Sequence, residues 1–176
     1  LYQIHVDDLE TPLEETLRTL EDLVRQGKIC HYGCSGFSAA RIGEAMKTAQ
    51  LHGLKGFVSS QQPYSLLDRK AERDIIPTMK TYGIGLIPNV PLHMGLLSGK
   101  YRRDEAPPAQ SRLGPRFSYT ARFFDGADWP TIEALRAFAA VRGRSLVEMA
   151  LGWLASRSPI ASVITGATSA EQVAQN

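Results

Sequence analysis

TPLEETLRTLEDLVRQGKICHYGCS (residues 11–35) is the stretch that decides the fold, because it predicts one helix followed by one strand. Its apolar residues recur at spacings of four, three and four, on one helical face: Leu13, Leu17, Leu20 and Val24. Thr11 and Glu14 have the spacing of an N-terminal capping box. Gly27 is typical of a helix end, and the strand covers about residues 29–35.

The same helix and strand pattern recurs along the chain. Further strands are predicted over residues 1–5, 57–61, 84–88 and 162–165. Further helices are predicted over residues 38–52, 69–82, 130–142, 146–157 and after Thr168. This alternation predicts an α/β fold with a parallel sheet and right-handed crossovers.

Two architectures contain such a sheet, an open doubly wound sheet and a (β/α)8 barrel. No Gly-x-Gly-x-x-Gly follows a predicted strand, which counts against a dinucleotide-binding open sheet. His5, Ser35, Gln61 and Thr168 all lie at or just after predicted strand ends, where a barrel builds its active site. A complete barrel takes about 200 residues or more, so we expect a partial (β/α)8 TIM barrel whose N-terminal strands are missing.

The composition excludes several other classes of protein. The chain has 176 residues, 43% hydrophobic and 22% charged, which is typical of one soluble globular domain. A net charge of +2 argues against nucleic acid or an anionic membrane as partner, and no apolar run reaches the roughly 20 residues of a membrane span. Cys30 and Cys34 lack further ligands for zinc, so no metal is expected, and their thiols favour a reducing compartment.

Several motifs, in order along the chain, resemble those of the aldo-keto reductases. They are Leu1-Tyr-Gln-Ile-His5, Gly33-Cys-Ser-Gly-Phe-Ser38, Gln61-Gln-Pro-Tyr-Ser-Leu-Leu-Asp-Arg69, Gly95-Leu-Leu-Ser-Gly-Lys-Tyr101 and Gly166-Ala-Thr-Ser-Ala-Glu-Gln172. The resemblance covers nearly the whole chain and implies the C-terminal part of one reductase domain, residues 1–176. It also implies a cytoplasmic, NADPH-dependent reductase of aldehydes or ketones, of unspecified oligomeric state.

The resemblance assigns roles to individual residues. His5 would be the catalytic histidine that hydrogen-bonds the substrate carbonyl. Ser35 and Gln61 would hold the nicotinamide carboxamide. The remaining cofactor-binding residues implied in this way are Pro91, Leu92, Lys100, Arg112, Thr168, Gln172 and Asn176. Lys100 and Arg112 fall in a long basic segment, residues 93–128, which is predicted to be a loop, either functional or disordered.

Some features depart from the family pattern. The family's catalytic aspartate, tyrosine and lysine come from strands before the one ending at His5, so we expect the chain by itself to be inactive. Asn89 stands where an aromatic residue usually stacks on the nicotinamide, and Gly36 replaces an asparagine. Two alternatives therefore stay open: a non-catalytic NADPH-binding subunit resembling potassium-channel β subunits, and an unrelated phosphate-binding barrel enzyme.

Overall fold

A computed structural model describes residues 1–114 and 118–175, which form two compact units. The first unit contains residues 1–63, 69–89 and 158–162. The second contains residues 64–68, 90–157 and 163–176. No helix in the described part of the chain is both long enough and apolar enough to cross a membrane.

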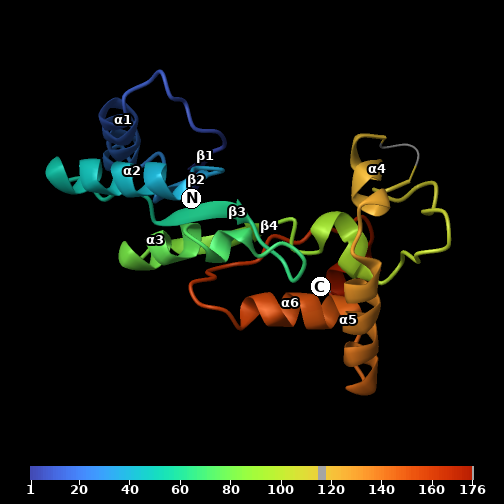
Figure 1. Ribbon diagram of the computed structural model, residues 1–176. Coiled ribbons are helices and arrows are strands. Elements are labelled where there is room, and N and C mark those ends of the chain that lie inside the picture. The colour runs from blue at the N-terminus through green and yellow to red at the C-terminus, as the bar shows by residue number, and fades with distance from the viewer. Residues whose placement is uncertain (115–117, 176) are drawn as a thin grey trace. The chain divides into compact units, whose positions relative to one another are not determined.

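The first unit is built on a four-stranded parallel sheet whose strands lie in chain order (Figure 1). The strands are β1 (Tyr2–Ile4), β2 (Tyr32–Ser35), β3 (Ser59–Pro63) and β4 (Gly85–Asn89). The helical elements between them are α1 (Leu13–Arg25), α2 (Ala39–Leu51), η1 (Lys70–Glu72) and α3 (Ile75–Thr81). This confirms the predicted α/β class, and the sheet is that of a partial TIM barrel.

The prediction of a fifth strand over residues 162–165 was wrong. The outer edge of β4 instead pairs with the residues just before this segment, in an isolated parallel bridge between Leu86 and Ile160. The Leu86 N–H donates to the Pro159 carbonyl at 2.9 Å, and the Ala161 N–H donates to the Leu86 carbonyl at 2.8 Å. Residues 159–161 therefore use the hydrogen-bonding groups of Leu86 that a later strand would have needed.

Two predicted helix starts were confirmed and one was not. Ser38 caps α2 by accepting a hydrogen bond from the Arg41 N–H at 3.2 Å. Ser145 and Glu148 form a complete capping box at the start of α6 (Leu146–Ala155). Thr11 does not cap α1: the N-cap position is Pro12, no side chain caps the helix, and the Thr11 hydroxyl donates to Asp8 at 2.6 Å. Asp74 caps α3, which divides the single helix predicted over residues 69–82 into two.

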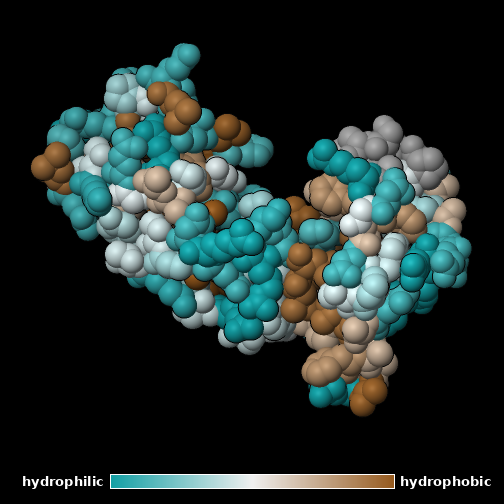
Figure 2. Space-filling model, viewed as in Figure 1, coloured by the Kyte–Doolittle hydropathy of each residue, from teal (hydrophilic) through white to brown (hydrophobic). Residues whose placement is uncertain are grey.

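The core of the first unit lies where the helices cover the sheet. Fully buried side chains come from α1, α2, α3, β2 and β4: Leu17, Ile42, Met79, Cys34 and Leu86. Over α1 and α2, the face shown in Figure 2 is mostly hydrophilic with isolated hydrophobic residues. The amphipathic pattern of residues 13–24 is thus explained by burial of one helical face.

The second unit consists of helices around a separate hydrophobic cluster. Its elements are η2 (His93–Ser98), α4 (Ser118–Asp125), α5 (Trp129–Val141), α6 and α7 (Ala170–Gln175). Tyr101 and Leu113 are buried in the cluster, and the Leu113 N–H donates to the Tyr101 hydroxyl at 3.3 Å. The segment predicted as a long loop is therefore anchored at its centre and contains η2 and α4.

Candidate functional site

The carboxyl ends of the strands in the first unit bring three predicted site residues together. Ser35, the last residue of β2, is in register with Gln61 of β3. Ile4 is in register with Cys34, so His5 follows β1 at the level of Ser35. The Gly36 N–H donates to the Gln61 carbonyl at 3.1 Å, which fixes the backbone at this level. Parallel pairing therefore aligns His5, Ser35 and Gln61 at one edge of the sheet.

The side chains of Ser35 and Gln61 remain available to a ligand. Ser35 is only 6% exposed and Gln61 is half-buried, yet neither side chain hydrogen-bonds to any other described residue. A hydroxyl and a primary amide next to each other offer donors and acceptors that suit a carboxamide. Burial favours such a partner, since unpaired polar groups in an interior carry a desolvation cost.

The same face of the sheet carries further polar residues that we did not predict as part of the site. Residues in register with one another point to the same face, so Gln3 and Ser59 lie on the face of Ser35 and Gln61. The Gln3 amide donates to the Ser59 hydroxyl at 3.3 Å. Parallel strands are ordinarily apolar on both faces, so a polar face indicates a surface that meets a polar ligand. The run of four polar residues in β3, Ser59 to Gln62, was the available signal.

Asn89 and Gly36, which depart from the family pattern, each have a structural explanation. Asn89 ends β4, and its side-chain oxygen is buried with no hydrogen-bond donor among the described residues. It adds one more unsatisfied amide oxygen to the carboxyl ends of the strands. Gly36 has φ 70°, in the left-handed region that glycine and asparagine adopt most readily. Glycine thus preserves the backbone shape that an asparagine would give there.

Pro91 and Leu92 lie in a strained turn of the second unit. Val90, His93 and Met94 have φ angles of 54°, 47° and 57°. Positive φ is a genuine outlier for a β-branched residue such as Val90. Pro91 is buried, and Leu92 packs against the hydrophobic cluster. Strain of this kind persists where surrounding packing enforces it, and it concentrates at ligand-binding segments.

The other predicted cofactor residues of the second unit are exposed. The Lys100 ammonium lies 5.2 Å from the centroid of the Tyr101 ring, and the Arg112 backbone carbonyl accepts a hydrogen bond from the Thr120 hydroxyl. The Thr168 N–H and hydroxyl both donate to the Gln172 side-chain oxygen, at 2.7 and 3.1 Å. Thr168 and Gln172 are therefore neighbours.

Asn176, the last predicted cofactor residue, lies outside the described residues. Thr168 and Glu171 have the spacing of a capping box, but it is the Ser169 hydroxyl that accepts from the Gln172 N–H, at 3.3 Å. The helix start is thus capped one residue after Thr168.

Other common kinds of catalytic centre have little support in the described part of the chain. It contains no group of three His, Cys, Asp or Glu residues that could hold a metal ion. Burial raises the pKa of the Cys34 thiol to about 11, so this residue stays protonated and unreactive at neutral pH.

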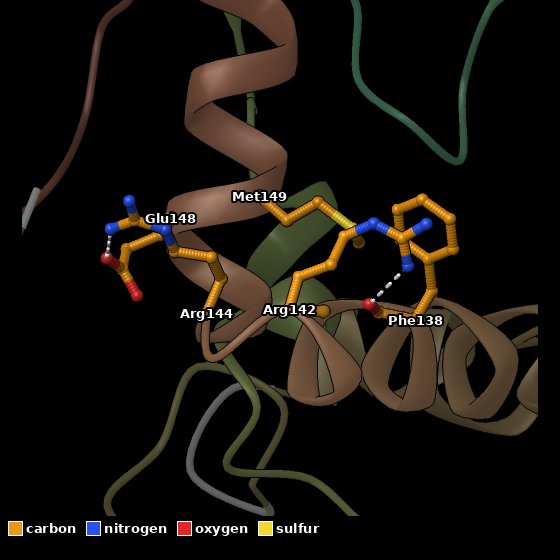
Figure 3. Close-up of a pocket in the computed structure, with 6 residues that line it drawn as sticks. Phe138, Arg142, Arg144, Glu148 and Met149 are labelled. Atoms are coloured by element: carbon orange, nitrogen blue, oxygen red, sulfur yellow. Dashed lines mark hydrogen bonds and ion pairs between the residues drawn. The ribbon is translucent and has the colours of Figure 1, made fainter.

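A surface concavity lies between α5 and α6, and none of the predicted site residues lines it. It has a volume of about 210 Å³ and is lined by Phe138, Ala139, Arg142, Arg144, Glu148 and Met149. Figure 3 shows Arg142 beside the Phe138 ring, 3.5 Å from its centroid, and the ion pair of Arg144 with Glu148. Its charged side chains already have partners, so it adds nothing to the candidate site.

Comparison with known proteins gives a family match over the full length. A family model described as "Aldo/keto reductase family" matches residues 1–176. The chain is 35% identical over 175 residues to a probable voltage-gated potassium channel subunit beta of Oryza sativa subsp. japonica, covering 98% of this chain and 53% of that protein. It is 32% identical over 182 residues to an L-glyceraldehyde 3-phosphate reductase of Escherichia coli O157:H7, covering 100% of this chain and 51% of that protein. The chain thus spans about half the length of the curated relatives it matches.

Proposed function

The chain belongs to the aldo/keto reductase family, and from that premise we propose that the whole protein reduces the carbonyl group of an aldehyde or ketone with NADPH. The relatives include oxidoreductases as well as potassium channel β subunits. Membership of this family excludes the unrelated phosphate-binding barrel enzyme considered from the sequence. The two free thiols suit a reducing compartment, so we also propose a cytoplasmic location, which microscopy of a fluorescent fusion tests.

The observation that carries the proposal is the unpaired polar pair, Ser35 and Gln61, at the carboxyl ends of neighbouring strands. These side chains fit the carboxamide of a nicotinamide, which has both a donor and an acceptor. Fixing the carboxamide would fix the ring face presented to the substrate. When bound, NADPH supplies the hydride for carbonyl reduction.

His5 would act on the substrate. Its imidazole is exposed just after β1, at the level of Ser35, where it can donate a hydrogen bond to a carbonyl oxygen. Such a bond orients the carbonyl and withdraws electron density from its carbon. In this proposal the proton for the product alcohol comes from the family's tyrosine, which this chain does not contain. Lys100, Arg112, Thr168, Gln172 and Asn176 are proposed to contact the phosphates and adenosine.

Fluorescence titration of the whole protein with NADPH tests the proposal. The variant Gln61→Leu keeps the side-chain size and removes the amide, so we expect binding about tenfold weaker, the loss of roughly one hydrogen bond. Gln50→Leu, on the exposed surface of α2, is the matched control and should bind as the unchanged protein does. Equal affinity of all three proteins would refute the assigned role of Gln61.

A second candidate is a non-catalytic NADPH-binding subunit. It is favoured by the potassium channel β subunit among the relatives and by Asn89, which cannot stack on a nicotinamide ring as an aromatic residue would. Loss of NADPH absorbance with simple aldehydes separates the two candidates. Turnover supports the reductase, whereas tight NADPH binding without turnover of any aldehyde or ketone supports the subunit.

A further inference from the structure

Two arginines of the second unit converge on one backbone carbonyl. The Arg136 guanidinium, on α5, donates through Nη2 to the Tyr101 carbonyl at 2.8 Å. The Arg102 guanidinium donates through Nη1 to the same oxygen at 3.0 Å and to the Gly99 carbonyl at 2.6 Å. Two positively charged groups are therefore held within hydrogen-bonding distance of a single atom.

Neither arginine has a carboxylate partner within the described ranges. The Glu133 charge acts on Arg136, but the two form no ion pair. Burial and then repulsion by Arg102 lower the pKa of Arg136, so the surroundings disfavour its charge. Its Nε is buried and has no acceptor. A guanidinium with one donor unpaired and a like charge beside it is an arrangement that an anion would stabilise.

We propose that Arg102 and Arg136 form a binding site for a phosphoryl group. Planar guanidinium groups match the oxygens of a phosphate, and a dianion neutralises two fixed positive charges at once. Arg102 is exposed and Arg136 is partly exposed, so an anion can reach them from solvent. Lys100, two residues before Arg102, adds a third positive charge to the same segment. Neither arginine was assigned a role by the resemblance to known reductases.

The phosphoryl group has two possible sources, a dinucleotide or a separate phosphorylated molecule. The chemistry of recognition is the same for both. If the phosphoryl group belongs to a dinucleotide, the dinucleotide should compete with inorganic phosphate for the site. If it belongs to a separate molecule, the dinucleotide and inorganic phosphate should bind at the same time. The site does not depend on the proposed reductase function.

Calorimetric titration with inorganic phosphate, at constant ionic strength set by chloride, tests the site. We expect Arg102→Gln and Arg136→Gln each to weaken phosphate binding about tenfold or more, because each removes one charge-assisted contact. Arg142→Gln is the control, since Arg142 follows the same helix, stacks on Phe138 (Figure 3) and loses the same charge. Arg102→Gln keeps the test valid if Arg136→Gln unfolds, because Arg102 is exposed.

Three results would overturn the proposal. They are no phosphate binding by the unchanged protein, an equal loss of phosphate affinity in all three variants, or displacement of phosphate by chloride that binds as well as phosphate does. Repeating the titration with NADPH present identifies the source of the phosphoryl group. A protein that binds phosphate but not NADPH would retain this site while refuting the proposed function, so the two failures are distinguishable.

Discussion

Replacing Gly33 with alanine would test how closely β2 and β3 must approach each other. An added Cβ would lie 2.5 Å from the Ser59 carbonyl oxygen and would also overlap the Ser59 hydroxyl oxygen. The carbonyl belongs to the paired strand and cannot rotate away, so the two strands must separate. Overpacking typically costs about 1–3 kcal/mol, and a clash with backbone belongs at the upper end, so we predict a loss of about 3 kcal/mol. Gly33 lies two residues before Ser35, and separation would also disturb the pairing of Ser35 with Gln61.

Urea unfolding followed by circular dichroism measures the loss. Gly152→Ala is the matched control, because a Cβ at Gly152 in α6 meets no atom within 4 Å. Alanine is favoured over glycine inside a helix by about 1 kcal/mol, so this control should be slightly more stable than the unchanged protein. A loss below about 1 kcal/mol for Gly33→Ala would show that the two strands can separate at little cost, against the reasoning from close approach.

Three further predictions follow from buried and capping hydrogen bonds. Tyr32→Phe removes a hydroxyl that accepts from the Gly56 N–H and donates to Glu21, both at 3.0 Å. Urea unfolding should show a free energy of unfolding lower by about 1–3 kcal/mol, and an unchanged value would contradict the role of these two hydrogen bonds. Burial, reinforced by Glu21, raises the pKa of Tyr32 to about 12. An unfolded tyrosine ionises near pH 10, so the unfolded state releases its proton first and stability should fall between about pH 10 and 12. Comparing urea unfolding at about pH 9 and 11 checks this, and the fall should be smaller in Tyr32→Phe. Ser145→Ala should cost about 1 kcal/mol in thermal melting by breaking the capping box with Glu148, whereas Ser145→Thr should cost little.

Local patterns were enough to predict most of the elements of the first unit. The apolar spacing of residues 13–24 corresponds to the buried face of α1, and α2 begins next to Ser38, where a helix was predicted to start. The failures lie where a side chain or segment has a different position or partner from the one expected. Thr11 lies one residue before the N-cap position, Pro12, and its hydroxyl bonds to Asp8 and not to the helix. Residues 162–165 have a strand-like composition, but the backbone N–H and carbonyl of Leu86 already bond to residues 159–161.

The candidate site was only partly accessible from the sequence for a related reason. The resemblance identified Ser35 and Gln61, but only strand register shows that they are paired and share a face with Gln3 and Ser59. The convergence of Arg102 and Arg136 could not be predicted, because no periodic pattern links residues so far apart in the sequence. Such contacts depend on how segments fold back on each other.

The strand order has a consequence for how the chain folds. Each of β1, β2 and β3 pairs with the strand that follows it in the sequence, so the sheet can form progressively as the chain is synthesised. Partner residues in these pairs are 26 or 30 positions apart, so each pairing waits only for the next helix and strand to be made. The bridge between Leu86 and Ile160 is different, because β4 must wait for a segment made much later. Until that segment arrives, the open edge of β4 is a place where a nascent chain could pair with another copy of itself.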